Sequence, residues 1–209
     1  MKERLKNCIL GWLASVCIAL IMVFVMKTFI GMPTTVKGTS MSTTLYPEDK
    51  LFLSTWDVNF NNTPKRGTII TFEAPSVEVL NDPANCTAIY KSDSRNIGEK
   101  ILYYGLGISN TSYIKRVIGL PGDHIQIKNG HVYINEVLYD EQYLSDATLT
   151  DMSTGGLCGD IVVPDGYVYV LGDNRSASVD SRKFGCIPLG KIEGKVVARW
   201  WPSNSKGTI

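Results

Sequence analysis

A long uncharged apolar run near the N-terminus dominates the hydrophobic pattern of the chain. It extends from Ile9 to Met26, and with Asn7 and Cys8 it comes close to the roughly 20 residues that a helix needs to cross a bilayer. A cleavable secretory signal would have an apolar core of about 7–15 residues, followed by a small-x-small cleavage site. Residues 27–31 contain no such site. We therefore expect a membrane-spanning helix.

The charges that precede this run predict its orientation. Basic residues outweigh acidic ones there, the residues being Lys2, Arg4, Lys6 and Glu3. Because the cytoplasmic flanks of membrane helices carry an excess of lysine and arginine, we expect the N-terminus in the cytoplasm. Residues 1–31 would then form the cytoplasmic end and the anchor, and residues 32–209 a domain on the outer face of the membrane.

The rest of the chain alternates between short apolar runs and turn residues. Each run is rich in Val, Ile, Tyr or Thr and is bounded by Gly, Pro, Asn or Asp, which is typical of β-strands. The runs are Lys50–Thr55, Thr68–Phe72, Tyr113–Leu120, His124–Ile127, His131–Ile134, Tyr167–Leu171 and Lys195–Trp200. Asn129-Gly130 predicts a tight hairpin, and Pro121-Gly122-Asp123 and Pro164-Asp165-Gly166 predict turns. We expect a mostly β domain with a folded-over antiparallel sheet or a barrel-like core.

One stretch does not fit this pattern. Residues 74–112 are polar, with clusters of Asn, Asp, Ser and Gly, and are interrupted by the run Lys100–Tyr104. Because a structureless loop of this length is uncommon inside a compact domain, we interpret the stretch as a long excursion or insertion. Outside the apolar N-terminal run, no long stretch shows helical periodicity.

The composition narrows the classes of function. Lys and Arg total 21 against 20 acidic residues, so the net charge of +1 offers no electrostatic basis for binding nucleic acid. The length of 209 residues suits one anchored domain with a substantial core. There is no C-x-x-C motif, and the two histidines, His124 and His131, lack a recognisable metal-ligand spacing. We therefore expect neither a metal nor another cofactor.

The cysteines do not define a disulfide framework. Cys8 and Cys17 belong to the apolar run, which leaves Cys86, Cys158 and Cys186 outside the membrane. These can form at most one disulfide, and their spacing does not identify the pair. Small buried side chains or a free thiol are equally compatible with the pattern.

A candidate nucleophile follows the anchor directly. The segment Gly38-Thr39-Ser40-Met41-Ser42 also matches the stretch around the nucleophile of subtilisin-like proteases. Those enzymes need an Asp and a His that precede the serine, whereas both histidines follow Ser40 here. That triad is excluded. A serine hydroxyl still needs a base, and lysine is the plausible substitute where histidine is not available.

Lys115 is the candidate base. In a strand, the two faces around it would each carry a cation between apolar neighbours: Tyr113-Lys115-Val117 and Ile114-Arg116-Ile118. Alternation therefore does not show which face is buried. On the residues alone, a solvated lysine with an apolar stem and an incidental serine are the more common interpretations.

Three blocks of the chain match one known family pattern. Its S-M-x-P-T-L is Ser40–Leu45 here, and its Y-x-K-R-x-x-G-x-P-G-D is matched at every fixed position by Tyr113–Asp123. Its G-D-N-x-x-x-S-x-D-S-R-x-F-G is met by residues 172–185, and a weaker block, Arg66–Phe72, has Thr68 where the family usually has Asp. In this order behind an apolar anchor, and up to about Pro202, the chain resembles a bacterial signal peptidase I of the small, single-anchor type.

Two positions depart from the family pattern. Thr43 stands where the family usually has proline, which relaxes the turn after the serine but removes no reacting group. Gly38 is a serine in some members, whose hydroxyl helps to stabilise the oxyanion; here backbone N–H groups, including that of Ser40, would have to do so. The variants that use histidine in place of lysine are disfavoured because the lysine position holds Lys115.

The resemblance implies a serine endopeptidase that removes N-terminal signal peptides from exported preproteins. Lys115, its pKa lowered by apolar surroundings, would take the proton of Ser40 and deliver it to the leaving amine, and water would release the acyl-enzyme. Ser178 would hydrogen-bond to the lysine and orient it. Asp180 and Arg182 would form an ion pair under the site, with an exposed surface pair as the alternative. The blocks contribute four further supporting residues: Met41, Gly172, Asp173 and Asn174.

The resemblance also implies how the substrate binds. The preprotein would add as an extended strand, and shallow pockets would admit small side chains one and three residues before the cut. The sequence does not identify the pocket residues, and Ile69 and Ile70 are weak candidates. The expected partners are signal peptides and the lipid bilayer, with the secretion machinery as a further candidate.

Two other functions share parts of this pattern. A sortase-like transpeptidase would have the anchor and the β-domain, but it needs a Cys nucleophile with His and Arg partners, and neither Cys158 nor Cys186 has a fitting context. A non-catalytic, membrane-anchored assembly or binding protein would make Ser40 and Lys115 incidental. A serine-directed reagent that blocks cleavage where thiol alkylation does not would distinguish the protease from both.

Overall fold

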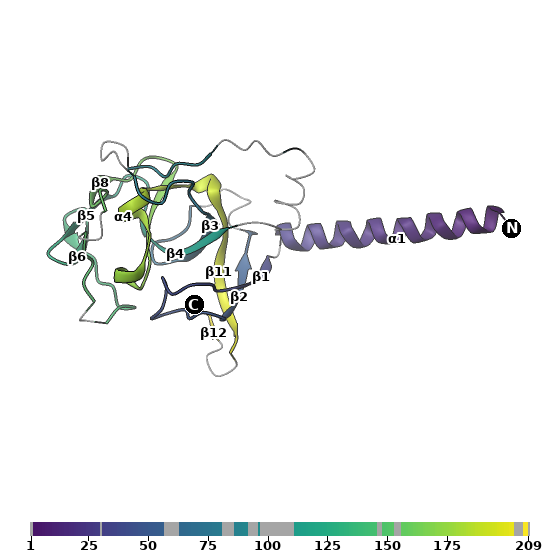
Figure 1. The fold of residues 1–209 in the computed structure, drawn as a ribbon, viewed down its shortest axis with the longest axis horizontal. Coiled ribbons are helices and arrows are strands. Elements are labelled where there is room, and N and C mark those ends of the chain that lie inside the picture. Colours follow the sequence, from purple (N-terminus) through teal and green to yellow (C-terminus); the bar gives the residue numbers. More distant parts are fainter. Residues whose placement is uncertain are drawn as a thin grey trace.

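A computed structural model shows one long helix that projects from a β-rich body (Figure 1). It describes residues 2–29, 31–56, 63–80, 86–91, 96, 111–145, 148–152, 156–202 and 207–208. Helix α1 (Lys2–Phe29) contains the predicted apolar run, and its segment Lys6–Val23 has a mean hydropathy of 1.9 and is not covered by the body. Among the described residues, α1 alone is long and apolar enough to cross a membrane.

The described strands form two sheets, of which the larger has eight strands and carries both ends of the body. Paired neighbours are antiparallel throughout. In spatial order the strands are β1 (Met32–Thr35), β2 (Lys50–Ser54), β11 (Ile192–Trp201), β3 (Ile69–Glu73), β4 (Ser112–Gly119), β9 (Tyr167–Leu171) and β10 (Ile187–Pro188), and β12 (Gly207–Thr208) pairs with β11. Because β11 lies between β2 and β3, the last long strand joins the segment after α1 to the middle of the sheet.

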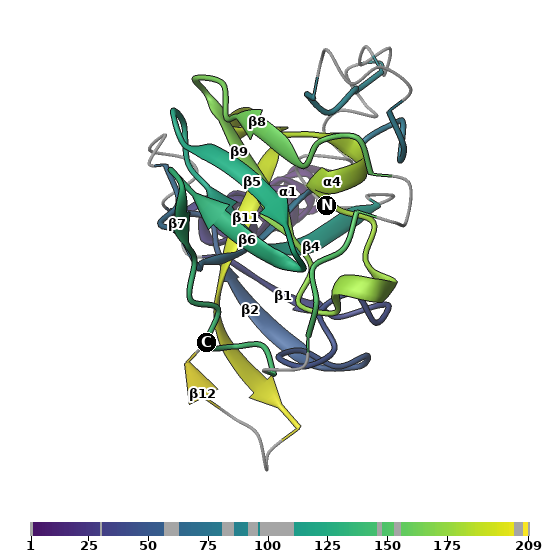
Figure 2. The same cartoon turned by 90° about the vertical axis from the view of Figure 1, so that its left-hand side faces the viewer.

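A four-stranded antiparallel sheet lies on the side of the body opposite α1 (Figures 1 and 2). Its spatial order is β7 (Val137–Leu138), β6 (His131–Ile134), β5 (His124–Lys128) and β8 (Asp160–Val162). The predicted hairpin is confirmed, because Lys128 pairs with His131 and the two residues between them have φ of 55° and 80°. Positive φ at both central residues is what a tight two-residue hairpin turn requires, and Asn-Gly supplies it at low cost.

Three clusters of buried apolar side chains hold these layers together. One joins the second sheet to β9, through Ile125, Val132 and Tyr169. The Phe72 cluster consists of Ile70, Phe72, Ala88, Val117, Val168, Val170, Phe184, Ile187 and Ile192. The Met41 cluster consists of Val36, Met41, Leu45, Leu51, Leu53, Ile69 and Val196, with Met32 and Ile114 packed against it. Strand β4 therefore contributes to different clusters from its two faces.

Every strand predicted from the sequence is present. The largest difference in bounds is in β11, which begins at Ile192 rather than at Lys195. Strands β1, β7, β8, β10 and β12 were not predicted, because two to four residues are too few to show alternation. In the described part of the last third of the chain there are three short helical turns, namely η2 (Arg175–Ala177), α4 (Ser181–Phe184) and η3 (Leu189–Lys191).

The excursion predicted for residues 74–112 connects the paired strands β3 and β4, and part of it is fixed to the body. Cys86 forms a disulfide with Cys158, and Ala88 packs into the Phe72 cluster. Cys186 is a buried free thiol whose backbone N–H donates to the Cys86 carbonyl oxygen at 2.7 Å. The structure thus selects one of the pairings that the sequence left open. The run Lys100–Tyr104 lies outside the described residues.

Candidate active site

Ser40 lies in a tight turn that two buried side chains attach to the core. We call residues 38–45 the Ser40 turn. Met41 and Leu45 are buried in the Met41 cluster, and the Leu45 N–H donates to the Met41 carbonyl oxygen at 2.9 Å. Gly38 enters the turn with φ of 90°, a conformation that favours glycine. Met41 and Leu45 therefore attach the turn to the core, while Ser40 stays partly exposed.

The Lys115 amine meets the Ser40 hydroxyl. Lys115 Nζ lies 2.7 Å from Ser40 Oγ and also donates to the Ile114 carbonyl oxygen at 3.0 Å. The lysine side chain is buried, with 4% of the residue exposed. Burial lowers the pKa of Lys115 from 10.5 to about 8, and the negative charges of Asp180 and Asp173 act in the opposite direction. A usable fraction of neutral amine is therefore present near neutral pH.

Strand β4 has an open edge next to this pair. Residues Ser112 to Gly119 pair with β3 on one side, but β9 pairs on the other side only from Arg116 onward. Among the described residues, Ser112–Lys115 consequently have no strand along their second edge. Such an edge can accept an added extended peptide, with its backbone next to Lys115.

Gly172 and Asn174 hold the Ser40 turn from the other side. The Asn174 backbone N–H donates to the Ser40 carbonyl oxygen at 3.0 Å, and Asn174 Nδ2 donates to the Thr39 carbonyl oxygen at 3.0 Å. A Cβ at Gly172 would overlap both that Ser40 oxygen and Ser178 Oγ. Glycine is therefore required at this position by close approach of the Ser40 backbone.

Asp173 joins β4 to the same turn. Its carboxylate is fully buried and accepts two hydrogen bonds from Arg116, from Nε at 2.9 Å and from Nη2 at 2.6 Å. It also accepts one from Thr44 Oγ1 at 2.6 Å. Because Arg116 follows Lys115 directly, this ion pair connects the strand of the lysine to the turn of the serine.

Asp180 and Arg182 form the predicted ion pair, and the exposed alternative is wrong. The two residues are 0% and 2% exposed, and Arg182 Nε and Nη2 each lie 2.8 Å from one carboxylate oxygen of Asp180. Asp180 also accepts the backbone N–H of Gly172 at 3.1 Å and caps α4 by accepting that of Arg182. The pair thus fixes the segment that contacts Ser40.

The hydrogen bond predicted between Ser178 and Lys115 is not formed in this structure. The residue is buried, and among the described residues its Oγ has no hydrogen-bond partner. Its hydroxyl is in close contact with Gly172. A buried hydroxyl without a partner is costly, and Lys115 Nζ, with two described acceptors for its protons, is short of one when it is charged.

A buried arginine and its partly buried partner, both belonging to this network, were not identified from the sequence. Arg175 is 2% exposed, donates from Nε to the Gly172 carbonyl oxygen at 3.0 Å and pairs with Glu141 through both Nη atoms. Arg182 Nη2 in turn donates to the Arg175 carbonyl oxygen at 2.6 Å. Arg175 stands at a variable position of the third block, and Glu141 follows β7 in a polar stretch, so no local pattern connects them.

Of the remaining predicted residues, Met41 supports the turn from the core, as described above, and the two isoleucines were proposed to form substrate pockets. Ile69 and Ile70, proposed as pocket residues, are 2% and 0% exposed and belong to the Met41 and Phe72 clusters. In β3, Ile70 pairs with Lys115 and Ile69 pairs with Arg116. Neither isoleucine presents surface to a substrate in this structure, and their role stays a prediction.

The histidines lie in another part of the molecule. His124 begins β5 and His131 begins β6, both in the second sheet, and His124 Nε2 lies 2.6 Å from an exposed carboxylate oxygen of Asp160. Ser40 Oγ instead contacts the lysine of the first sheet. The sequence argument against a Ser-His-Asp triad is therefore supported by the arrangement of the sheets.

A serine hydroxyl at hydrogen-bond distance from a buried lysine amine defines a class of site. It is the arrangement of serine hydrolases that use lysine where others use histidine. In this chain the pair lies in an antiparallel β body, beside an open strand edge, and an apolar helix precedes it.

The chain belongs to the signal peptidase family, peptidase S26, whose family model matches residues 9–201. Signal peptidase I P of Bacillus subtilis subsp. natto is 35% identical over 185 residues, which are 87% of this chain and 82% of that protein. Signal peptidase IB of Staphylococcus aureus strain COL is 31% identical over 210 residues, 95% of this chain and 92% of that protein.

Among solved structures, a signal peptidase I from Enterococcus faecalis V583 is 26% identical and superposes with a TM-score of 0.40, covering 64% of this chain and 97% of that one. The family match and the two relatives confirm the resemblance found in the sequence. The protein is accordingly a protease.

Proposed function

We propose that Ser40 and Lys115 form the catalytic dyad with which this membrane-anchored signal peptidase removes N-terminal signal peptides from exported preproteins. The observation that carries the assignment is the 2.7 Å contact between Ser40 Oγ and the buried Lys115 Nζ. A lysine in water would be protonated at neutral pH and could not accept a proton. Burial lowers the pKa of Lys115 to about 8, which makes the neutral amine accessible.

The reaction then follows from the positions of these groups. Neutral Lys115 takes the proton of Ser40 as its oxygen attacks the scissile carbonyl carbon. Backbone N–H groups, including that of Ser40, stabilise the oxyanion, since Gly38 has no side chain to assist. Lys115 delivers the proton to the leaving amine, and water, activated by the same lysine, hydrolyses the acyl-enzyme.

The open edge of β4 supports the mode of substrate binding. A signal peptide that adds as a strand along Ser112–Lys115 would place its scissile carbonyl at Ser40, because Ser40 Oγ is hydrogen-bonded to Lys115, the last residue of that edge. Side chains one and three residues before the cut would then point to the same face, since successive residues of a strand alternate. Small side chains are expected at these two positions, as the family resemblance implies.

The anchor supports the cellular placement. Helix α1 is apolar and uncovered, and the basic residues before it favour a cytoplasmic N-terminus. The body would then act on the outer face of the bacterial cell membrane, where the exported part of a preprotein emerges. The secretion machinery that delivers the preprotein is a candidate partner.

The assignment is tested with the full chain purified in detergent and a preprotein that carries a small-x-small cleavage site. We expect Ser40→Ala to abolish cleavage while its circular dichroism spectrum matches the wild type, because the hydroxyl is needed for chemistry and contributes little to packing. Ser42→Ala, which changes the next serine in the same turn, is the matched control and should retain cleavage. Wild-type cleavage by Ser40→Ala would remove the serine protease assignment.

A further inference from the structure

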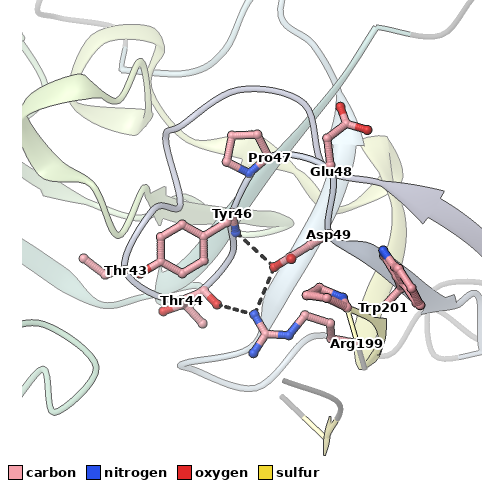
Figure 3. Close-up of a pocket in the computed structure, with 9 residues that line it drawn as sticks. Thr43, Thr44, Tyr46, Pro47, Glu48, Asp49, Arg199 and Trp201 are labelled. Carbon is pink, nitrogen blue, oxygen red and sulfur yellow. Dashed lines mark hydrogen bonds and ion pairs between the residues drawn. The ribbon is translucent and has the colours of Figure 1, made fainter. Parts of the chain in front are cut away.

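An open cavity of about 540 Å³ lies beside the Ser40 turn. Tyr46 and Trp201 form part of its lining, and each is about half exposed, at 54% and 51%. Figure 3 shows their rings on either side of the Arg199–Asp49 ion pair, whose charged atoms are 2.9 Å apart. The cavity thus combines aromatic walls with a floor whose two charges compensate each other.

The cavity and the dyad share one structural element. Thr44 lines the cavity, and its carbonyl oxygen accepts a hydrogen bond from Arg199 at 3.1 Å (Figure 3). The side chain of the same residue donates to Asp173, which is paired with Arg116 beside Lys115. The rim of the cavity is therefore the end of the turn that carries Ser40.

The register of the sheet places the cavity on one particular side of the dyad. Lys115 pairs with Ile70, and Ile70 pairs with Lys195, so these residues lie at one level across β4, β3 and β11. Strands β4 and β11 run in the same direction, because both are antiparallel to β3. Arg199 and Trp201 come after Lys195 and hence lie beyond the level of Lys115.

Along the strand direction, the open edge of β4 and the residues Arg199 and Trp201 lie on opposite sides of the level of Lys115. The open edge comprises Ser112–Lys115, whereas β9 occupies the edge from Arg116 onward. A substrate that pairs with the open edge up to its scissile bond must therefore leave Ser40 toward the level of Arg199. Two strand spacings and about four residues of rise separate Lys115 from Arg199, a distance of roughly 15–17 Å, which about five extended residues can span.

We infer that this cavity binds the segment of the preprotein that follows the cleavage site, at about the third to the fifth residue after the cut. The inference rests on the proposed function and extends it to the substrate residues beyond the signal peptide. The aromatic walls favour an apolar or aromatic side chain. Thr44 at the rim and Asp49 and Arg199 at the floor are polar groups against which the peptide backbone can lie.

The test uses peptides that share one signal-peptide end and one small-x-small cleavage site. The short peptide ends two residues after the cut, the polar long peptide continues with serines, and the apolar long peptide has Phe or Leu at the third to fifth residues. We expect the full chain to cleave the apolar long peptide with a kcat/KM about tenfold above that of the other two, as one partly buried large side chain provides.

The variants compare two neighbouring tryptophans. Trp201 lines the cavity, whereas Trp200 is not among its lining residues and lies 5.4 Å below the Lys50 amine. Trp201→Ala should reduce the ratio between the apolar long and the short peptide to roughly one, and Trp200→Ala should leave the ratio at its wild-type value. Tyr46→Ala removes the facing wall and should also reduce the ratio. If Trp201→Ala cleaves no peptide at all, the ratio measured for Tyr46→Ala tests the inference in its place.

Three results would overturn the inference. One is equal cleavage of all three peptides by the wild type, and another is an equal loss of the ratio in Trp200→Ala and Trp201→Ala. The third is a ratio that is present in detergent but disappears in vesicles of anionic lipid, which would assign the cavity to lipid. Failure of the wild type to cleave any of the peptides would instead contradict the proposed function, so the two failures are distinguishable.

Discussion

Lys115 and Arg116 are consecutive buried cations on opposite faces of β4, and only Arg116 is hydrogen-bonded to a carboxylate. Arg116 faces the buried carboxylate of Asp173, which accepts two of its N–H groups, so its charge is compensated. Lys115 Nζ donates to a hydroxyl and a carbonyl oxygen, and burial lowers its pKa to about 8. The arginine, a permanent cation, is paired with a carboxylate and serves the structure. The lysine, which can lose its proton, has neutral acceptors and becomes available as a base.

Exchange of the lysine for a permanent cation breaks this comparison most severely. Arginine retains the charge and much of the length, but it cannot be deprotonated in a protein. We expect Lys115→Arg to lose at least about a thousandfold in kcat, as much as Lys115→Ala. Single-turnover cleavage of a preprotein measures both. Processing by the arginine variant at a rate near that of the wild type would exclude Lys115 as the base.

Removal of the compensated cation should mainly destabilise the fold. Arg116→Met leaves the Asp173 carboxylate buried without its partner, and we expect a loss of about 3–5 kcal/mol in the free energy of unfolding. Denaturant unfolding of the full chain in detergent measures this loss. The double variant Arg116→Met/Asp173→Asn should recover part of it, because the stranded charge is then absent. Equal stability of the single variant and the wild type would show that the pair contributes nothing.

Lys115→Met should stabilise the fold, whereas Arg116→Met should destabilise it. A folded-state pKa lowered from 10.5 to about 8 means that protonated Lys115 destabilises the fold by up to about 3 kcal/mol. This cost is fully present below about pH 8 and disappears as the pH rises toward 10.5. We expect Lys115→Met to be more stable than the wild type at pH 7, with a smaller difference at about pH 10. A less stable methionine variant at pH 7 would contradict the desolvation argument.

The pH dependence of cleavage reports the same pKa through activity. Protonated Lys115 cannot accept the Ser40 proton, so kcat/KM should fall about tenfold per pH unit below the apparent pKa and level off above it. We expect that pKa to be near 8. Initial rates with a peptide substrate of constant charge give the profile. An apparent pKa near 10.5, the value of free lysine, or a profile without any pH dependence would disagree with a buried base.

The smallest effect concerns Ser178, whose buried hydroxyl has no described partner. If the hydroxyl turns to Lys115 when the substrate is bound, Ser178→Ala should lower kcat about fivefold with little change in KM, the value of one hydrogen bond. Ser176→Ala, which changes an exposed serine nearby, is the matched control. An unchanged kcat and pH profile in Ser178→Ala would leave Ser178 with a packing role only.

Local patterns were sufficient for the larger elements. Apolar length predicted α1, and runs of β-branched residues between turn residues predicted the long strands, because both signals depend on neighbours in the chain. Asn129-Gly130 predicted its hairpin for the same reason, since the required positive φ is a property of those two residues. The short edge strands carry too few residues for a period to be visible, so only pairing with their neighbours reveals them.

The sequence by itself determined which residues are available for chemistry: a serine after an apolar anchor, a lysine in a β-run, and the blocks that resemble one family. The tertiary structure decided which cation is buried beside a carboxylate, which cysteine pairs with Cys158, and that Arg175 meets Glu141 from 34 positions away. Alternation along a strand does not show which of its two faces is buried, and the separation of two residues in the sequence does not show how far apart they lie in the fold. Charge compensation and pairing are therefore decided only when distant segments pack together.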